Sequence, residues 1–353
     1  MRVCLIASSR FPIREPYQGG LESHTATLAR ELIRRGHQVS VFAAPGSDRS
    51  LNVEELPVRA FASSPAARQD VGAVPEQWMQ EHHAYLGLML HLAGSGTSRF
   101  DVIHNNSLHH LPIAMAHLTA VPLVTTLHTP PVAWLESAIR YAPASARFVA
   151  VSEHTRAAWS RSVSSTVVLN GVDTDRWHLG PGGGRAVWSG RIVPEKAPHL
   201  AVLAARRAGV KIDVAGPVMD ERYFREALLP VLNDDAAYVG HLHDEDLIEA
   251  VGRAAVVVVT PQWDEPYGLV AAEAMSCGTP VAAFARGALP ELVDPVAGDL
   301  AAPDDVDALA GAIRTAATLD RSAVRRHAVE HFSVARMVSS YEALYEQQEG
   351  AVA

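Results

Sequence analysis

The sequence predicts an α/β protein with two doubly wound, Rossmann-like domains that face each other across a cleft. Its 353 residues are enough for two domains of ordinary size. Short apolar runs typical of buried strands alternate with stretches of helical periodicity along most of the chain. A glycine-rich segment at 180–184 interrupts this series near its middle. Aromatic residues make up only 6% of the chain, so small aliphatic side chains are expected to fill both cores.

The first domain opens with a strand–loop–helix–strand unit, which is how doubly wound domains begin. Residues 2–8 form an apolar run of the kind that is buried on both faces of a parallel sheet. A loop that ends in Gly19 and Gly20 leads into a helix with one apolar face. Residues 38–44 then form the second strand. Further strands are predicted at 101–104, 121–127 and 147–151.

Two segments between these strands differ in character. Segment 62–76 is rich in alanine, serine and proline, which predicts an exposed connection. Segment 77–93 carries aromatic and aliphatic side chains at helical spacing, which predicts a helix that packs on the sheet. Alternatively, this helix lines a site for an acceptor substrate. The two interpretations are compatible.

A second strand–helix series follows a change of composition at 170–184. Residues 170–173 have the composition of a turn, and the glycines of 180–184 indicate a flexible linker. Residues 333–348 form an amphipathic helical pattern with Ser333 as its N-cap. Strands are predicted at 185–189, 210–215, 236–239, 254–260 and 279–284. The expected organisation is a first domain over 1–170, a linker over 171–184, a second domain over 185–332 and a C-terminal helix over 333–353.

The charge of the chain argues against nucleic acid as a partner. The net charge is -9, and no tract of lysine and arginine is present. The densest basic cluster, Arg321, Arg325, Arg326 and His327, predicts a solvated helix face, with a weak membrane-surface contact as the alternative. No apolar run approaches the roughly 20 residues that span a bilayer, and the short apolar N-terminus does not resemble a signal peptide. We therefore expect a cytoplasmic protein without a membrane segment.

Neither cysteine nor histidine spacing indicates a disulfide or a metal site. Cys4 and Cys277 lie among apolar residues, so both are expected to be buried and reduced. The 17 histidines include no H-E-x-x-H motif, and no C-x-x-C pair occurs. Two adjacent histidine pairs, at 82–83 and 109–110, would point in different directions on a helix. We therefore expect no metal ion and no other cofactor.

The most distinctive motif follows the apolar strand at 254–259 and runs from 264 to 281. Pro266 suits the entry to a helix, and Gly268 allows a ligand to approach the backbone closely. The free amides of Gly268, Leu269 and Val270 would then form an anion site at the helix start.

Two carboxylates flank this helix start. Glu265 precedes the helix, and Glu273 lies about one and a half turns inside it, where its side chain leans back toward the N-terminus. Carboxylates beside a phosphate site make chemical sense if they bind hydroxyls, one on a ribose and the other on a sugar. The alternative makes Glu265 a partner of the helix dipole and Glu273 a solvent-facing residue.

A second motif follows the first strand of the second domain. It consists of Gly190 and Arg191, followed by Pro194, Glu195 and Lys196. Two cations are thereby placed around one strand-to-helix turn. Fixed cations in a closed cleft stabilise the negative charge that develops on a diphosphate leaving group. The alternative is a capped helix start with surface cations.

Together these motifs resemble the family 4 retaining glycosyltransferases. Seven residues separate Glu265 from Glu273, and Ala-Met-x-Cys-Gly-Thr-Pro-Val follows, which is similar to that family's E-x7-E signature. The motif at 190–196 resembles the family's diphosphate loop. Supporting matches are Gly19-Gly20-x-Glu22, Thr126-x-His128 and Asn170-Gly171-Val172-Asp173.

The resemblance implies the GT-B fold, a nucleotide diphosphate sugar as donor and catalysis without a metal. It also implies that the C-terminal helix crosses back onto the first domain. It assigns Arg191 and Lys196 to the diphosphate, Glu273 to the ribose, and Glu265 and His128 to the transferred sugar. The other donor-binding positions that it implies are Gly19, Gly20, Gly190, Leu242, Tyr267, Gly268, Leu269 and Val270.

We therefore expect a retaining glycosyltransferase that moves a hexose from a nucleotide diphosphate sugar, with UDP favoured over GDP, to an unidentified acceptor. A sugar-nucleotide epimerase or hydrolase of the same architecture is an alternative, as is a non-catalytic nucleotide-sugar binder. A nicotinamide oxidoreductase is disfavoured because the first loop lacks G-x-G-x-x-G. One departure from the family falls on the acceptor side, where Asn105 and Asn106 follow His104 in place of a frequent second histidine.

Overall fold

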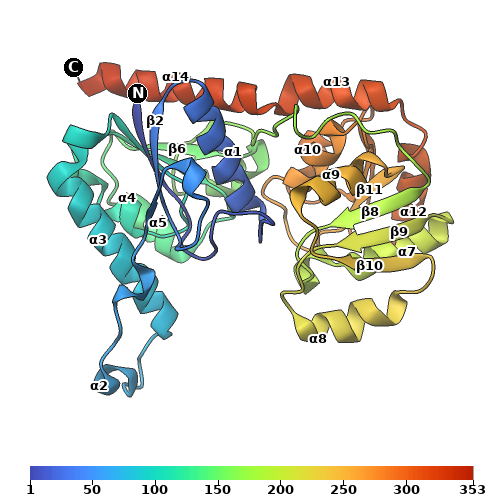
Figure 1. The fold of residues 1–353 in the computed structure, drawn as a ribbon, viewed down its shortest axis with the longest axis horizontal. Helices are drawn as coiled ribbons and strands as arrows, with labels where there is room; N and C mark the ends of the chain where they lie inside the picture. Colours follow the sequence, from blue (N-terminus) through green and yellow to red (C-terminus); the bar gives the residue numbers. More distant parts are fainter. Residues whose placement is uncertain (353) are drawn as a thin grey trace.

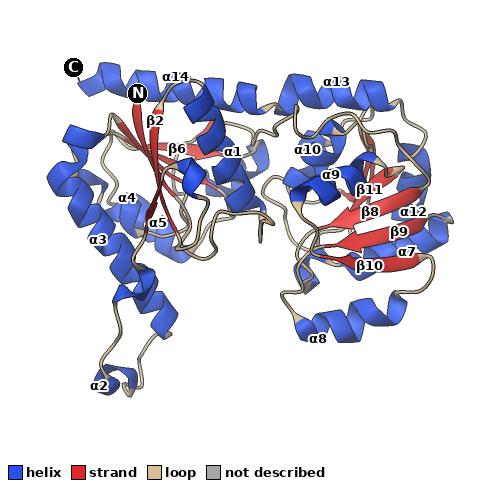
Figure 2. Ribbon diagram, in the orientation of Figure 1, coloured by secondary structure: helices blue, strands red, loops and turns tan. Residues whose placement is uncertain are grey.

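The computed structural model describes residues 1–352, which form two parallel sheets with helices packed around each (Figures 1 and 2). The first sheet has seven strands in the order β3-β2-β1-β4-β5-β6-β7, and the second has six in the order β10-β9-β8-β11-β12-β13. The two units lie side by side, and both chain termini lie at the first unit. The predicted α/β fold of two doubly wound units is confirmed.

The first unit alternates strands and helices in the predicted order. Its strands are β1 (Arg2–Ile6), β2 (Gln38–Ala43), β3 (Val53–Glu55), β4 (Val102–Asn105), β5 (Leu123–Leu127), β6 (Arg147–Ala150) and β7 (Thr166–Val167). Its helices are α1 (Gly20–Arg34), α2 (Pro65–Arg68), α3 (Glu76–Arg99), α4 (Leu111–Ala114), α5 (Ala133–Ile139) and α6 (Glu153–Trp159).

The second unit repeats this alternation. Its strands are β8 (Arg185–Ser189), β9 (Lys211–Ala215), β10 (Ala236–Gly240), β11 (Val256–Val259), β12 (Val281–Phe284) and β13 (Gly298–Ala301). Its helices are α7 (Pro198–Ala208), α8 (Glu221–Tyr223), α9 (Asp244–Gly252), α10 (Leu269–Ser276), α11 (Leu289–Leu292) and α12 (Val306–Ala316). Helices α13 (Arg321–Phe332) and α14 (Val334–Val352) end the described chain.

The sequence pattern does not predict β3, β7 or β13. All three lie at sheet edges, and each contains partly exposed residues. An edge strand lacks a neighbour on one side and is less fully covered. It therefore needs no continuous apolar run of the kind that identifies the central strands β1 and β11.

The last two helices run one after the other along both units (Figure 1). Helix α14 buries Met337, Val338, Tyr341 and Tyr345 in the core of the first unit. Helix α13 instead packs on α10 of the second unit and contributes to that unit's core. The C-terminal part of the chain therefore contacts both walls of the cleft.

The basic cluster in α13 is not a solvated helix face, so that prediction is wrong for two of its members. The Arg321 guanidinium donates hydrogen bonds to the carbonyls of Gly252 (2.8 Å) and Cys277 (3.1 Å). The Arg325 guanidinium donates to the carbonyl of Thr174 (2.6 Å). These carbonyls lie at helix ends or in the chain between the two units, where intrahelical partners are missing. Arg325 therefore fastens the connection between the units, whereas Arg321 binds carbonyls within the second unit.

The glycines of segment 180–184 pack tightly against the second unit. The amide of Gly180 donates to the carbonyl of Cys277, and that of Gly182 donates to the carbonyl of Gly252, both at 3.0 Å. A Cβ atom at Gly180 would lie 2.3 Å from the Gly252 carbonyl oxygen. The composition of this segment predicts a flexible linker. In the structure, the glycines instead allow its backbone to pack closely against the backbone of the second unit, because they have no side chains.

Several smaller predictions hold. Segment 62–76 is an exposed connection that contains α2, and segment 77–93 lies within α3, whose apolar face packs in the core of the first unit. Cys4 and Cys277 are both free and buried. Within residues 1–352, no helix combines the length and the apolar character that crossing a bilayer requires.

Candidate active site

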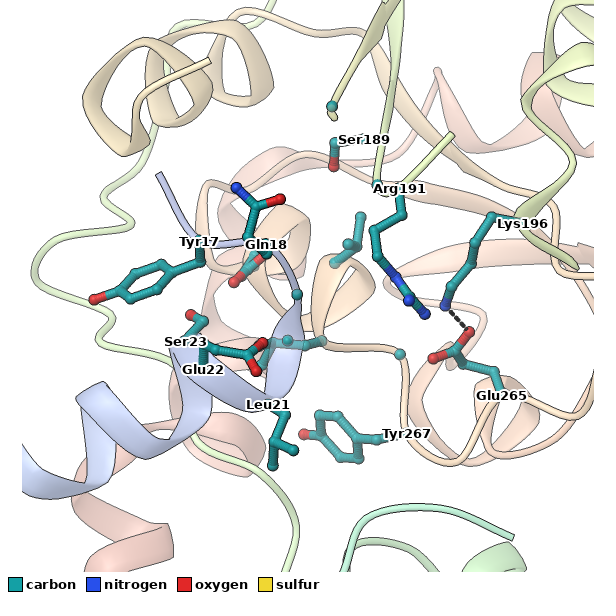
Figure 3. A pocket seen from close by; sticks show the side chains of 18 of the residues that line it. Tyr17, Gln18, Leu21, Glu22, Ser23, Ser189, Arg191, Lys196, Glu265 and Tyr267 are labelled. Atoms are coloured by element: carbon teal, nitrogen blue, oxygen red, sulfur yellow. Dashed lines mark hydrogen bonds and ion pairs between the residues drawn. The ribbon is translucent and has the colours of Figure 1, made fainter. Parts of the chain in front are cut away.

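A cavity of about 430 Å³ opens between the two units and is lined by every candidate site residue. Figure 3 shows part of this lining, including Arg191, Lys196, Glu265 and Tyr267. Its walls include the loops that follow β1, β5, β8, β10 and β11, and doubly wound sheets bind ligands at this carboxyl edge. The predicted residues that line it are Gly19, Gly20, His128, Gly190, Arg191, Lys196, Leu242, Glu265, Tyr267, Gly268, Leu269, Val270 and Glu273.

The loop that carries Arg191 and Lys196 is held from behind by Thr260. The hydroxyl of Thr260 lies 3.0 Å from the Lys196 carbonyl and 3.1 Å from the Ala197 carbonyl. It also accepts a hydrogen bond from the Trp188 indole at 3.0 Å. Lys196 therefore extends from a backbone that these hydrogen bonds fix in place, which is the preorganisation that electrostatic catalysis needs.

Lys196 and Glu265 form an ion pair inside the cavity (Figure 3). The indole of Trp263 donates to the same carboxylate at 3.2 Å, and the Lys196 ammonium lies 5.3 Å from the centre of the Trp263 ring. The Glu265 carboxylate is therefore held by side chains instead of serving as a cap for the nearby helix. Figure 3 also shows the Arg191 side chain extending into the cavity next to this pair.

Helix α10 begins at the cavity, as predicted. Its N-cap, Gly268, has φ of 102°, and a Cβ atom there would lie 2.8 Å from a methyl carbon of Leu289, so only glycine fits without strain. The amide of Ala271 donates to the Gly268 carbonyl, which leaves the preceding amides outside the helix's own hydrogen bonds. Gly20, at the start of α1, approaches Leu269 from the opposite wall, where an added Cβ atom would lie 3.7 Å from its side chain.

Glu273 is half-buried and lines the cavity, so the solvent-facing alternative is wrong. Burial, helped by the nearby Asp244 carboxylate, raises the pKa of Glu273 to about 8. Among the described residues, no cation pairs with this carboxyl, which therefore has capacity to bind hydroxyls. Tyr267 is almost fully buried, and its hydroxyl donates to the carbonyl of Asn170 at 2.6 Å. That bond joins the site loop to the turn between the two units.

His128 projects from the end of β5 and is oriented by Asn106. Its Nε2 lies 2.8 Å from the Asn106 Oδ1, and its ring packs edge-on against His24 at 4.9 Å. Burial, with the neighbouring His24 and His104, holds the pKa of His128 well below its usual range. Because Nε2 carries the hydrogen that Asn106 accepts, the neutral ring presents Nδ1 as an acceptor.

Sequence reasoning gave no role to Glu22, which also lines the cavity (Figure 3). This carboxyl is 5% exposed. Burial raises its pKa to about 7, although the positive charges of Arg191 and Arg10 oppose the rise. Its place three residues after the first glycine of the loop was visible in the sequence, but its burial depends on how the two units meet. Trp263 and Asn106 were also missed, because their contacts with Glu265 and His128 arise from side-chain packing within one unit.

The two units also contact each other beside the cavity. The hydroxyls of Ser152 and Thr155 donate to the Pro266 carbonyl at 2.6 and 3.0 Å. The Glu291 carboxylate of the second unit accepts hydrogen bonds from the amides of Glu153 and His154 at the start of α6. A carboxylate at a helix N-terminus is electrostatically favourable, so this contact favours the arrangement in which the cavity is formed.

Three histidines cluster outside the cavity, which corrects one expectation. His82 on α3 and the pair His109 and His110 have ring nitrogens within 4.8 Å of one another. The rings of His109 and His110 stack at 4.4 Å with an angle of 24° between them, because the pair lies in a turn before α4 and not within a helix. The argument that these adjacent rings point apart is therefore wrong.

Two family profiles match this chain, one over each unit. The profile described as Glycosyltransferase Family 4 matches residues 18–176, and the profile described as Glycosyl transferases group 1 matches residues 179–329. The chain belongs to the family 4 glycosyltransferases. The two matches end and begin beside the connection between the units, so each unit corresponds to one profile.

Relatives of this glycosyltransferase cover most of its length. A glycogen synthase of Mycobacterium tuberculosis is 28% identical over 92% of this chain and 88% of its own. A D-inositol 3-phosphate glycosyltransferase of Mycobacterium avium is 29% identical over 98% of this chain and 95% of its own.

Solved structures establish that this glycosyltransferase has the GT-B fold. The sucrose-phosphate synthase of Thermosynechococcus elongatus superposes with a TM-score of 0.77 at 21% identity, over 99% of both chains. HepE of Anabaena, in complex with UDP and glucose, gives 0.75 at 19% identity, over 98% of this chain and 99% of its own. AviGT4, a glycosyltransferase of avilamycin A biosynthesis, gives 0.73 at 23% identity, over 99% and 98%.

Proposed function

We propose that this glycosyltransferase transfers a hexose from a UDP-sugar with retention of anomeric configuration and without a catalytic metal. The observation that carries the proposal is the grouping of Arg191, Lys196 and the start of α10 around one cavity. These are two fixed cations and one helix N-terminus, the groups that stabilise a departing diphosphate. Cations supplied by the protein do here what a bound metal ion does in other phosphate sites.

The proposed chemistry breaks the bond between the anomeric carbon and the β-phosphate oxygen and forms a bond from the same carbon to an acceptor oxygen. The acceptor hydroxyl loses its proton to the leaving phosphate. Attack comes from the face that the phosphate leaves, because Glu265 is engaged with Lys196 and Trp263 and no carboxylate is assigned as a nucleophile on the opposite face. Neutral His128 would accept a hydrogen bond from a sugar hydroxyl through Nδ1.

The choice of UDP rests on similarity and not on a base-reading side chain in this chain. HepE of Anabaena, which shares the fold, was solved with UDP and glucose. Leu242, one of the donor-binding positions that the resemblance implies, follows β10 and lines the cavity together with His241. Glu273, with its raised pKa, is proposed to bind the ribose hydroxyls from the floor of the same cavity.

A thermal-shift titration tests the donor assignment. The purified protein is titrated with UDP, GDP and ADP, with and without a chelator, because a ligand that binds the folded state raises the melting temperature by mass action. The matched variants are Arg191→Ala, in the cavity, and Arg326→Ala, on an exposed face of α13. We expect UDP to stabilise the wild type and Arg326→Ala equally and to stabilise Arg191→Ala less. The chelator should leave these shifts in melting temperature unchanged. Stabilisation by none of the three nucleotides would overturn the proposal.

A further inference from the structure

A group of aromatic and imidazole rings projects from the first unit, beside the cavity. The indoles of Trp78, on α3, and Trp134, on α5, meet at 5.3 Å with an angle of 57°. The ring of His110 stacks on Trp134 at 5.1 Å, and His109 stacks on His110. We call Trp78, Trp134, His109 and His110 the aromatic corner, because the two indoles meet at an open angle.

Two neighbouring residues connect the aromatic corner to the cavity. Leu108, the neighbour of His109 in sequence, lines the cavity. Tyr85 stacks on His109 at 4.5 Å, and its hydroxyl donates to the carbonyl of Ala7, the residue before Ser8 on the cavity wall. The corner is therefore continuous with the wall opposite Arg191 and Lys196.

The corner exposes apolar ring surface together with the polar nitrogens of its indole and imidazole rings. Trp134 is 55% exposed and Trp78 is 40% exposed, although indoles are usually well buried in a folded protein. An indole combines a broad apolar face with one polar N–H group. The C–H face of a sugar ring packs on such a surface, while the hydroxyls at the ring edge reach imidazole nitrogens and indole N–H groups.

The corner offers no strong cation for an acidic acceptor. It contains no lysine or arginine. Burial lowers the pKa of His109 to about 3, and it also lowers the pKa of His110, so both rings are neutral at pH 7. A phosphate or carboxylate on the acceptor would lose its hydration at this surface without gaining a partner charge.

The same histidines do not form a good metal site with His82, although the three lie close together. The amide of Leu111 donates to Nδ1 of His109 at 3.2 Å, which places the ring hydrogen of neutral His109 on Nε2 and leaves no free lone pair there. The nearly parallel rings of His109 and His110 also point their nitrogen lone pairs along separate planes. Metal ligands need lone pairs that converge on one point.

We propose that the aromatic corner is the acceptor-binding surface and that the acceptor presents a neutral sugar ring to it, as in an uncharged oligosaccharide or glycoside. This inference rests on the proposed function, because an acceptor presupposes transfer. It adds to that function the chemical class of the acceptor and names Trp78 and Trp134 as residues that set specificity.

Saturation-transfer NMR tests the proposal in the presence of saturating UDP. The probes are maltotriose and cellotriose, which are neutral, and glucose 6-phosphate, which carries the same ring with a charge. The variants are Trp134→Ala and Trp78→Ala. The matched control is Tyr141→Ala, which removes an aromatic ring that is 75% exposed on the same unit but is not part of the corner. Folding of each variant is checked by its melting temperature and by its thermal shift with UDP.

We expect at least one neutral trisaccharide to bind the wild type and Tyr141→Ala, and to lose about tenfold in affinity in each tryptophan variant. The UDP shift should stay unchanged in all variants. Trisaccharide binding that survives both substitutions would overturn the proposal. So would binding of glucose 6-phosphate alone, binding of Zn²⁺ that His110→Ala abolishes, or binding of no saccharide. Failure of UDP to bind the wild type would instead count against the proposed function. The thermal shift with UDP measures that outcome separately from saccharide binding.

Discussion

The ammonium of Lys196 is ion-paired with the carboxylate of Glu265, and this contact joins the two most distinctive motifs of the chain. Both side chains are shielded, with exposures of 22% and 13%. The pair links the loop after β8 to the loop after β11 at the floor of the cleft. Each partner also has a proposed donor contact, Lys196 with the diphosphate and Glu265 with the sugar, so their charges balance before a donor binds.

The ion pair should be energetically coupled. We expect a double-mutant cycle with Lys196→Gln and Glu265→Gln to give a coupling of about 0.5–3 kcal/mol in the free energy of unfolding, because either single change leaves a shielded charge without its partner. The measurement is urea denaturation of the four proteins. The pair Arg222 and Glu226, which is 82% and 64% exposed, is the matched control and should show a coupling near zero.

Loss of Arg191 should reduce turnover strongly. Arg191→Ala removes one preorganised cation from the leaving group, and the loss of one such donor typically lowers kcat by about 10²–10³-fold. Steady-state kinetics with a saturating UDP-sugar measure this effect, with Arg326→Ala as the control for loss of a surface charge. Unchanged turnover in Arg191→Ala would remove this residue from the mechanism.

The fold and most of the residues that line the cavity could be predicted from the sequence, because apolar strands and glycine-bearing loops are recognisable from short stretches of residues. Arg191, Glu265 and Glu273 all follow strands at the carboxyl edge, so topology alone brings them together. Contacts between side chains, across the two units or within one of them, leave no pattern in the sequence. The orientation of His128 by Asn106 and the pairing of Lys196 with Glu265 depend on side-chain packing, which no spacing reveals.

The basic cluster of α13 shows a different limit. Arg321 and Arg325 have the spacing of a charged surface, yet their guanidinium groups bind carbonyls at the ends of other segments. A long arginine side chain can bury its stem and satisfy backbone groups far from its own helix. Sequence periodicity predicts which face of a helix carries a side chain. It does not predict which groups the end of that side chain contacts.

The raised pKa of Glu273 should make stability depend on pH. Its pKa is about 8 in the folded protein and 4.5 ordinarily, so between these values the folded state keeps a proton that the unfolded state has lost. The free energy of unfolding contributed by this residue therefore falls as pH rises through that window. Glu273→Gln removes the effect.

Urea denaturation of wild type and Glu273→Gln across this window measures the contribution. The stability of the wild type relative to the variant should decline as pH rises from 4.5 toward about 8 and then level off. Both proteins retain Glu22 and Asp244, whose raised pKa values also affect the wild-type curve, so the difference reports Glu273 together with its interaction with Asp244. A difference that is constant across the window would show that Glu273 is ionised in the folded protein.

Asn106 should control the charge of His128. In Asn106→Asp a carboxylate would lie beside the Nε2 of His128 and favour the protonated ring, against the opposing influence of burial, His24 and His104. We expect kcat to fall at low pH in this variant, with a midpoint above that of the wild type. The pH–rate profile measures it. Asn106→Leu, which removes the hydrogen bond without adding a charge, should lower kcat without moving the midpoint.

The stereochemistry of the released sugar tests the central claim most directly. The nucleotide sugar that binds best in thermal-shift experiments is incubated with the enzyme, and proton NMR records the first anomer formed by transfer to water, before mutarotation. An α-linked donor should give the α-anomer first, and Arg191→Ala should give it far more slowly. Appearance of the β-anomer first would contradict the retaining mechanism and require a base that activates water on the opposite face.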